Sequence, residues 1–365
     1  MKYLFILGRN IELSQQEIHS YLNRKNNKIL SETLDKNALF INLENKIPQE
    51  TIKELGGILR IGEIIAYSNN ITKELEKFQI YNGESNKLNY VIWDFSKNYS
   101  EVEDYIKQRF KSEKLKATIK HLTDKIDSQN KEEFYMPSSK LLNEEYFIFQ
   151  ENGTDYFGKI IQQPNYEEIK KRDMEKPVRR ESLAISPRLA KILVNLAEPK
   201  QTLLDPFCGV GTIIQEALLQ DINTIGIDKD KKAIEGAEKN LKWLNFLKEK
   251  YELINSDSTK INIPEISAIA TEPDLGQILK KIPQKHEAEK TLINFKELII
   301  QVINNLKEKV SGKIVFTSPY IRIGKKRLSC NIENICERTN YRLIKQIPEF
   351  RENQIIGRMI YILEN

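Results

Sequence analysis

Short apolar segments alternate with amphipathic ones along the chain, a pattern typical of proteins that combine helices and strands. In the N-terminal region, residues 3–7, 38–43 and 58–67 are apolar enough to predict three strands. A capping-box pattern at residues 14–17 and a segment at 48–55 that Gly56 and Gly57 end predict two helices between them. This order of elements predicts an α+β ferredoxin-like domain over residues 1–70.

The next region, residues 71–165, mixes strands with one clearly amphipathic helix. A strand is expected at residues 89–95, a helix at 99–112, and a hairpin at 145–161 around Asn152-Gly153. Cations gather between positions 107 and 120, with Glu113 as the one acid there: Lys107, Arg109, Lys111, Lys114, Lys116 and Lys120. Such a cluster indicates either a face that contacts phosphates or an ordinary solvated helix surface, and the pattern alone leaves both open.

A polar segment at residues 166–184 separates this region from the rest of the chain. It contains Pro177 and several cations, including Arg179 and Arg180. High polarity and a proline predict an exposed linker.

The C-terminal region, residues 185–365, has the regular alternation of an α/β domain. Ser186-Pro187 is a typical helix start, and a long amphipathic helix is expected at 287–306. Strands are expected at 202–204, 224–227, 252–254, 268–270, 313–316 and 358–363. The alternation predicts a doubly wound, mostly parallel Rossmann-like sheet with helices on both faces. Ligands of such sheets bind at the carboxyl ends of the strands.

Composition sets limits on the class of protein. A chain of 365 residues is expected to form two or three domains. The sequence has no apolar run of about 18 residues, and its N-terminus reads as a strand, so we expect no membrane segment and no signal peptide. The odd number of cysteines, three, predicts a cytoplasmic protein rather than a disulfide framework. The three cysteines and three histidines have no metal-ligand spacing, so no metal site is expected. A net charge of +5 permits binding to nucleic acid.

The polar residues that follow the predicted strands form the candidate site. Asp205 ends the first strand of the Rossmann-like domain and is followed by Gly209 and Gly211, which allow a ligand to approach the backbone. Asp228 ends the next strand, where an acid often binds the ribose hydroxyls of a nucleotide. A helix cap is the alternative role for Asp228.

Two further acidic loops follow the third and fourth strands. Asp257 could accept a hydrogen bond from an adenine amino group, or could merely form an Asx turn. The loop Glu272-Pro273-Asp274-Leu275-Gly276 could form a polar catalytic wall, or could be an ordinary acidic loop. We predict Glu272, Pro273 and Asp274 as catalytic residues.

Several of these motifs resemble a known family. The block at residues 205–212, Asp-Pro-Phe-Cys-Gly-Val-Gly-Thr, resembles class I methyltransferases that modify amino groups of nucleic acids. The whole chain resembles the archaeal-type tRNA guanine-N2 methyltransferases that have a THUMP domain, through residues 5–10, 55–64, 156–159, 172–177 and 185–197.

The resemblance implies a function and roles for individual residues. Such enzymes transfer a methyl group from S-adenosylmethionine to the exocyclic N2 amine of a guanosine in tRNA, typically at position 10. Residues 71–165 would be the THUMP domain, which binds tRNA together with the ferredoxin-like domain. The basic residues listed above, with Arg179 and Arg180, would contact RNA. Cofactor contacts would come from Asp205, Gly209 and Gly211 at the methionine part, Asp228 at the ribose, and Lys229 and Asp257 at the adenine. Phe207 is also expected to contact the cofactor.

The fourth motif departs from the family pattern, which is Asp or Asn followed by Pro-Pro and an aromatic residue. This chain has Glu272, Pro273, Asp274 and Leu275 instead. A leucine cannot stack on a flipped base, and such stacking contributes about 1–3 kcal/mol per base. Tyr320, expected just after the fifth strand, could supply a ring or could be a surface tyrosine.

Three hypotheses therefore remain open from the sequence. The first is an active tRNA guanine-N2 methyltransferase. The second is a tRNA-binding protein with little or no catalysis, and the third is a methyltransferase of the same fold with a different acceptor. The sequence does not say whether a partner subunit is required.

Overall fold

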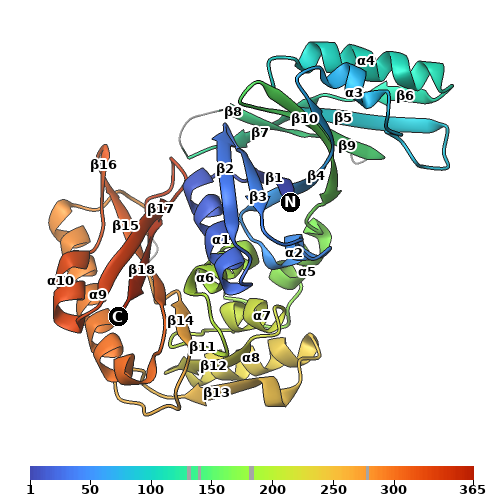
Figure 1. Cartoon of the computed structure of the whole chain (residues 1–365). Helices are drawn as coiled ribbons and strands as arrows, with labels where there is room; N and C mark the ends of the chain where they lie inside the picture. The colour runs from blue at the N-terminus through green and yellow to red at the C-terminus, as the bar shows by residue number, and fades with distance from the viewer. Residues whose placement is uncertain (130–132, 139–140, 181–184, 277–278) are drawn as a thin grey trace. The chain divides into compact units, whose positions relative to one another are not determined.

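The computed structural model describes residues 1–129, 133–138, 141–180, 185–276 and 279–365. The chain forms two compact units, coloured along the chain in Figure 1. The N-terminal unit comprises residues 1–11, 27–53 and 58–164. The C-terminal unit comprises residues 12–26, 54–57 and 165–365, so two short segments from the start of the chain belong to it.

The N-terminal unit is built on one mixed sheet, with strand order β2-β3-β1-β4-β10-β9-β5-β6. Strand β5 pairs in parallel with β6 and β9, and the other neighbours are antiparallel. A separate hairpin joins β7 and β8. The strands are β1 (Lys2–Leu7), β2 (Ile29–Asp35), β3 (Ala38–Leu43), β4 (Ile58–Ser68), β5 (Lys87–Phe95), β6 (Lys116–Ile119), β7 (Leu122–Asp127), β8 (Glu133–Pro137), β9 (Glu144–Glu151) and β10 (Thr154–Gln162).

The helices of this part are short except for one. They are α2 (Thr51–Glu54), α3 (Ile71–Leu75) and α4 (Tyr99–Ser112). The predicted apolar face of α4, formed by Val102, Ile106 and Phe110, is fully buried in a core that includes Tyr90 and Tyr146 of the sheet. Strand β2 was not expected from the sequence, because its residues are exposed or half-buried and form no apolar run.

Strands from the two predicted N-terminal domains belong to the same sheet. Strand β4, from residues 1–70, pairs with β10, from residues 71–165. The division of this region into a ferredoxin-like and a THUMP domain stays a prediction.

The C-terminal unit contains a second mixed sheet, with strand order β13-β12-β11-β14-β15-β18-β17. The strands from β13 to β15 are parallel, whereas β18 and β17 are antiparallel to their neighbours, and β16 pairs with β15. The strands are β11 (Thr202–Asp205), β12 (Asn223–Asp228), β13 (Tyr251–Asn255), β14 (Ala268–Thr271), β15 (Ile314–Ile323), β16 (Lys326–Leu328), β17 (Arg342–Glu349) and β18 (Ile356–Glu364).

Helices connect these strands and cover the sheet. They are α1 (Ile11–Arg24), α5 (Tyr166–Met174), α6 (Pro187–Ala197), α7 (Thr212–Leu218), α8 (Lys231–Trp243), α9 (Lys285–Leu306) and α10 (Ile332–Thr339), with one-turn 3₁₀ helices η1 (Lys248–Lys250) and η2 (Lys307–Lys309). The α/β class predicted for this region is thereby confirmed, and the six predicted strands are present. One boundary is wrong: β15 continues through residues 317–320, where the sequence had suggested a loop after the strand, because these residues pair with β18.

A buried carboxylate fixes helix α1 within the C-terminal unit. Glu17 is fully buried and accepts hydrogen bonds from the backbone N–H groups of Gly56 and Gly57, both at 2.7 Å. It also accepts one from Nδ2 of Asn195 in α6, at 2.8 Å. These bonds join residues 12–26 and 54–57 to the C-terminal unit, whose other residues, 165–365, come much later in the sequence.

The predicted linker is only partly an exposed connector. Residues 166–174 form α5, where Arg172 pairs with the fully buried Glu216 of α7 at 3.0 Å. Lys176 is buried, and the backbone N–H of Val178 donates to Oδ1 of Asn240 in α8 at 2.9 Å. Lys176 is therefore buried, against the expectation of an exposed linker, whereas the other described residues of the segment are exposed or half-buried. Residues 181–184 lie outside the described part of the chain.

Neither a membrane-spanning helix nor a cluster of metal ligands is found among the described residues. No helix in those ranges is long and apolar enough to cross a lipid bilayer. Within the same ranges, His, Cys, Asp and Glu side chains form no group of three that could hold a metal ion.

Candidate active site

The parallel strands bring the predicted site residues to one edge of the second sheet. In the register, Asp205 of β11 lies beside Gly226 of β12, and Asp228 lies beside Asn255 of β13. Thr271 ends β14 on the other side of β11 and donates a hydrogen bond to Asp205. The loops after these strands therefore open onto the same carboxyl edge, as doubly wound sheets require.

The loop after β11 is shaped by two glycines with positive φ. Gly209 has φ +53° and Gly211 has φ +85°, values that side chains other than glycine rarely adopt. A Cβ added at Gly209 would meet no other atom within 4 Å, so the space above this residue is open. The N–H of Gly209 donates to Oδ2 of Asp228 at 2.9 Å. An open glycine surface beside a fixed carboxylate fits the adenosyl and methionine parts expected of the cofactor.

Asp228 is held in one orientation by its own loop. Its Oδ1 accepts the N–H of Asp230 at 2.8 Å, while Asn255 donates to its backbone carbonyl at 2.9 Å. A carboxylate can accept about four hydrogen bonds, so Asp228 retains capacity for ribose hydroxyls. Helix α8 is capped by Asp230 rather than by Asp228, which removes the alternative role considered for Asp228.

Asp205 is buried, whereas a residue in direct contact with a cofactor needs an accessible side chain. Its side chain is buried and accepts the hydroxyl of Thr271 at 2.6 Å and the N–H of Phe207 at 3.1 Å. Burial raises the pKa of Asp205 to about 7, against the opposing effect of these two hydrogen bonds. The structure thus makes Asp205 a residue that joins the ends of β11 and β14 and positions the glycine loop.

The other predicted cofactor residues differ in exposure. Phe207 is half-buried and packs against the apolar core, whereas Lys229 and Asp257 are exposed. Oδ1 of Asp257 accepts the N–H of Thr259 at 2.9 Å, and this bond lowers the pKa of Asp257. The Asx turn allowed by the sequence is therefore present, and contact with an adenine stays a prediction.

Lys176 is a candidate that the sequence did not single out. Its Nζ donates to the hydroxyl of Thr212, the residue that follows Gly211, at 2.9 Å. The side chain is only 4% exposed, and burial lowers its pKa. A buried ammonium group beside the glycine loop is suited to an anionic group such as the methionine carboxylate. The signal that could have identified it is the Lys176-Pro177 pair inside an otherwise polar segment.

The loop after β14, residues 272–276, is called the acceptor loop after its expected role. It is dominated by an ion pair between Glu272 and Arg358 of β18. Nη2 of Arg358 donates to Oε1 of Glu272 at 2.9 Å, and Nε donates to Oε2. The Thr317 hydroxyl of β15 adds a bond to Oε2 at 3.2 Å. Burial alone would lower the pKa of Arg358, but the neighbouring charge of Glu272 raises it. No sequence pattern indicates Arg358, which lies 86 residues from its partner.

The rest of the acceptor loop separates into buried and exposed residues. Pro273 is buried, Leu275 is half-buried, and Asp274 is exposed. Oδ1 of Asp274 accepts the N–H of Gly276 at 2.9 Å, so this acid shapes its own loop. Of the predicted catalytic residues, Glu272 is therefore the one whose carboxylate is held against the neighbouring strands.

Tyr320 lies within β15 rather than in a loop. Its ring contacts Phe350 edge-on, with centroids 5.6 Å apart, and the guanidinium of Arg327 lies 5.7 Å from its centroid. These contacts engage the ring within the unit, which favours the structural role over the replacement of the missing aromatic residue.

The predicted RNA-binding cations fall on different elements. Lys107 and Arg109 of α4 form ion pairs with Glu103 and Glu113 on the same helix. The remaining cations of this cluster are exposed or half-buried on or near α4 and β6: Lys111, Lys114, Lys116 and Lys120. Arg179 and Arg180 are half-buried in the C-terminal unit, where Arg180 pairs with Asp230.

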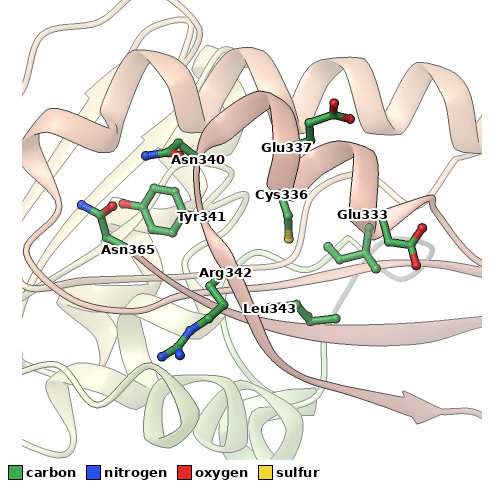
Figure 2. A pocket seen from close by; sticks show the side chains of 9 residues that line it. Glu333, Cys336, Glu337, Asn340, Tyr341, Arg342, Leu343 and Asn365 are labelled. Carbon is green, nitrogen blue, oxygen red and sulfur yellow. The ribbon is translucent and has the colours of Figure 1, made fainter.

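A groove with a volume of about 500 Å³ lies between α10 and β17 (Figure 2). Its lining includes Cys336, Tyr341, Arg342 and Asn365, and none of the predicted site residues. The groove is therefore separate from the carboxyl edge of the parallel strands.

Comparison with known proteins shows that the chain is similar to methyltransferases. A family model described as a DNA methylase matches residues 14–239, and one described as an RMKL-like methyltransferase domain matches residues 177–327. A tRNA (guanine(10)-N2)-dimethyltransferase of Methanothermobacter thermautotrophicus is 33% identical over 140 residues, which cover 38% of this chain and 39% of that protein. The protein of the same name from Methanocaldococcus jannaschii is 34% identical over 142 residues, covering 36% and 37%.

One solved structure shares the fold along the whole chain. The crystal structure of TrmN from Thermus thermophilus superposes with a TM-score of 0.54 at 13% identity, covering 100% of both chains. The chain spans well under two thirds of the length of the two curated relatives that it matches. The matches confirm the resemblance to tRNA guanine-N2 methyltransferases that was inferred from the sequence.

Proposed function

The chain belongs to the DNA methylase family whose model spans residues 14–239, and from this premise we propose that it methylates a guanosine of tRNA. The acceptor is the exocyclic N2 amine, at the nucleotide named in its curated relatives, position 10. The methyl donor is S-adenosylmethionine, which supplies an electrophilic methyl group on a sulfonium. The observation that carries the proposal is the placement of Glu272 at the same strand edge as the glycine loop.

The glycine loop and its neighbours form the cofactor half of the site. Gly209 leaves open space over the backbone, Asp228 would hold the ribose, and Lys176 would hold the methionine carboxylate. Asp205 acts indirectly by fixing the loop to Thr271. Cofactor contacts from Phe207, Lys229 and Asp257 belong to the same proposal.

Glu272 positions the acceptor amine. The lone pair of a guanine N2 is delocalised into the ring, so a hydrogen bond from the amine to a fixed carboxylate helps to aim it at the methyl carbon. The new bond forms between N2 and that carbon while the bond from carbon to sulfur breaks, and the amine proton leaves to water. Arg358 and Thr317 occupy some lone pairs of Glu272 and hold it still, and a carboxylate retains capacity for one more donor.

The N-terminal unit and the basic residues have a role in this proposal as the tRNA-binding part. The THUMP and ferredoxin-like assignments of residues 71–165 and 1–70 belong here, as does a cytoplasmic location. Exposed lysines such as Lys111, Lys114 and Lys116 are the contacts with phosphate that these assignments favour, together with Lys107, Arg109, Lys120, Arg179 and Arg180.

The test is a methylation assay on unmodified tRNA. Purified protein is incubated with S-adenosylmethionine and a tRNA transcript, and the nucleosides are analysed by mass spectrometry. We expect N2-methylguanosine or its dimethyl form at one position, and its loss when that guanosine is replaced by adenosine. Asp228→Ala, which removes the ribose contact, is the inactive control. Absence of both nucleosides from the wild-type reaction would rule out the proposed activity.

A second candidate is methyl transfer to a different nucleic acid amine. Leu275 gives the acceptor loop no ring to stack on a base, and the matching family model is described as a DNA methylase. Radiolabelled methyl transfer to DNA duplexes, run beside the tRNA assay, separates the two candidates. A protein that binds tRNA but transfers no methyl group to either nucleic acid would instead be the binding protein without catalysis.

A further inference from the structure

The hairpin of β15 and β16 extends past the sheet edge that contains the acceptor loop. Strand β14 ends at Thr271, opposite Phe316, whereas β15 continues to Ile323 and turns at Gly324 into β16. Figure 1 shows this hairpin reaching away from the body of its sheet. Thr317, at the base of the extension, contacts Glu272, so the hairpin begins directly beside the acceptor loop.

The hairpin is strongly cationic for its length. Residues 309–332 contain six lysines and arginines and no acid. Four of these cations lie on the hairpin itself: Arg322, Lys325, Lys326 and Arg327. Lys325 and Lys326 are exposed, and the exposed Arg351 follows Phe350, whose ring contacts Tyr320 of the same hairpin edge-on.

The two arginines are held in place by carbonyl groups. Arg327 donates to the carbonyls of Tyr320 at 3.1 Å and Ile355 at 3.3 Å, and its guanidinium lies 4.3 Å from the ring centroid of Phe350. Arg322 donates to the carbonyls of Gly324 at 3.1 Å and Glu352 at 3.3 Å. Such bonds fix a guanidinium without neutralising its charge.

Across the residues that the structure describes, no carboxylate lies within ion-pair distance of these four cations. On α4, by contrast, Lys107 and Arg109 have carboxylate partners. Unneutralised cations on a rigid projection attract a polyanion, and the salt dependence of such binding follows the number of phosphates contacted.

We propose that the β15–β16 hairpin binds backbone phosphates of the substrate RNA on one side of the nucleotide presented to Glu272. This inference rests on the proposed function, since it names the surface of the C-terminal unit that receives the tRNA. A nucleotide that enters the acceptor loop keeps its flanking phosphates outside, and the hairpin lies beside that entrance. The arginines held by carbonyl groups set the position of the turn, and Lys325 and Lys326 supply the exposed charges.

The experiment compares two double variants with the same change in charge. Lys325→Gln with Lys326→Gln removes the charges of the turn. Lys239→Gln with Lys242→Gln removes two charges from the exposed face of α8, which packs beside β12 and β13, far along the sheet order from β15. Binding of labelled tRNA is measured by fluorescence anisotropy at several salt concentrations, and KM and kcat are measured by methylation.

We expect the hairpin variant to bind tRNA about 10-fold more weakly and its salt slope to fall by 1 to 2, since each lysine-phosphate contact contributes about one counterion. The effect should fall on KM for tRNA more than on kcat, and the α8 variant should match the wild type. Equal affinity and slope for the two variants would overturn the inference. If the wild type binds tRNA but transfers no methyl group, the proposed activity fails while the binding comparison still decides this one.

Discussion

Two carboxylates at the ends of neighbouring parallel strands, Asp205 at the end of β11 and Glu272 directly after β14, are held in different ways. The side chain of Asp205 is buried and its partners are a hydroxyl and a backbone N–H. The side chain of Glu272 is 7% exposed and its main partner is a guanidinium. Burial without a cation raises the pKa of Asp205 to about 7.

This difference distinguishes the cofactor half of the site, around Asp205 and the glycine loop, from the acceptor half, around Glu272. The cofactor half depends on contacts within one short stretch and its adjacent strand, so it keeps its geometry without a distant charge. The acceptor half depends on Arg358, which is brought to Glu272 only because β18 inserts between β15 and β17. Each half can therefore be tested by removing the kind of partner on which it depends.

The largest effect is expected from Arg358→Ala. The change leaves the carboxylate of Glu272 nearly buried without its cation, which we expect to cost about 3 kcal/mol of stability. A carboxylate free to move by about 1 Å misaligns the acceptor, so kcat for methyl transfer should fall about 100-fold. Chemical unfolding and steady-state kinetics measure the two effects, and KM for S-adenosylmethionine should stay unchanged.

Arg342→Ala is the matched control for this ion pair. Arg342 lies on the neighbouring strand β17 and pairs with Glu364, but its side chain is 74% exposed. Exposed pairs contribute little, so stability and kcat should remain close to wild type. If Arg358→Ala behaved in the same way, the ion pair would not be what positions Glu272.

The next effect concerns Asp205 and pH. Because burial raises its pKa to about 7, the folded protein holds a proton on Asp205 between about pH 4 and 7 that the unfolded chain has lost. The free energy of unfolding should therefore decrease as pH rises through this window. Between about pH 4 and 7, the free energy of unfolding of the wild type should fall by at most about 4 kcal/mol relative to that of Asp205→Asn. Urea unfolding at several pH values measures this difference.

Asp257→Asn gives a control of opposite sign. The hydrogen bonds from Thr259 lower the pKa of Asp257, so its contribution to stability is present above the unfolded pKa and is lost as pH falls. If the free energy of unfolding of the wild type and of Asp205→Asn depended on pH in the same way between about pH 4 and 7, the carboxyl group of Asp205 would not titrate there.

The same contrast explains how much the sequence predicts. The glycine loop and the strand-ending acids follow from spacing, since each contact joins residues close in sequence or on adjacent parallel strands. Gly209 and Asp228, 19 residues apart, are both candidate site residues from the sequence, and in the structure they are joined by a hydrogen bond. Strand β15 was predicted too short, because its extension is stabilised by antiparallel pairing with β18, which the local pattern of residues 317–323 does not reveal.

Partners far apart in sequence were missed for the same reason. Arg358 has ordinary surroundings in sequence, and Lys176 is marked only by the proline that follows it. The contacts of both residues appear only when the fold places them beside Glu272 and Thr212. Glu17 likewise reads as the end of a capping box, yet it is buried and joins α1 to α6. The burial of a charged residue is a property of the tertiary structure, so composition and periodicity do not predict it.

Lys176→Met tests a charge in the cofactor half. The variant keeps an apolar stem of similar length and removes the buried ammonium beside Thr212. We expect the Kd for S-adenosylmethionine to rise about 10-fold, since a charged hydrogen bond contributes about 1.5–3 kcal/mol. Calorimetric titration with the cofactor measures it, with the exposed Lys200→Met as control. An unchanged Kd would assign Lys176 to the packing of residues 172–178 alone.

The smallest effect, and the one that distinguishes the acceptors, is expected from Leu275→Tyr. Leu275 is half-buried in the acceptor loop, at the position where the resembled family has an aromatic residue. If the acceptor is a flipped base, a ring at this position adds stacking, and kcat/KM on tRNA should rise about 5-fold, near the lower end of base-aromatic stacking. Leu279→Tyr, nearby but outside the motif, is the control for added apolar surface. A fall in kcat/KM for Leu275→Tyr alone would instead mean that the leucine is fitted to an acceptor other than a flipped guanine, because the larger side chain would then exclude it.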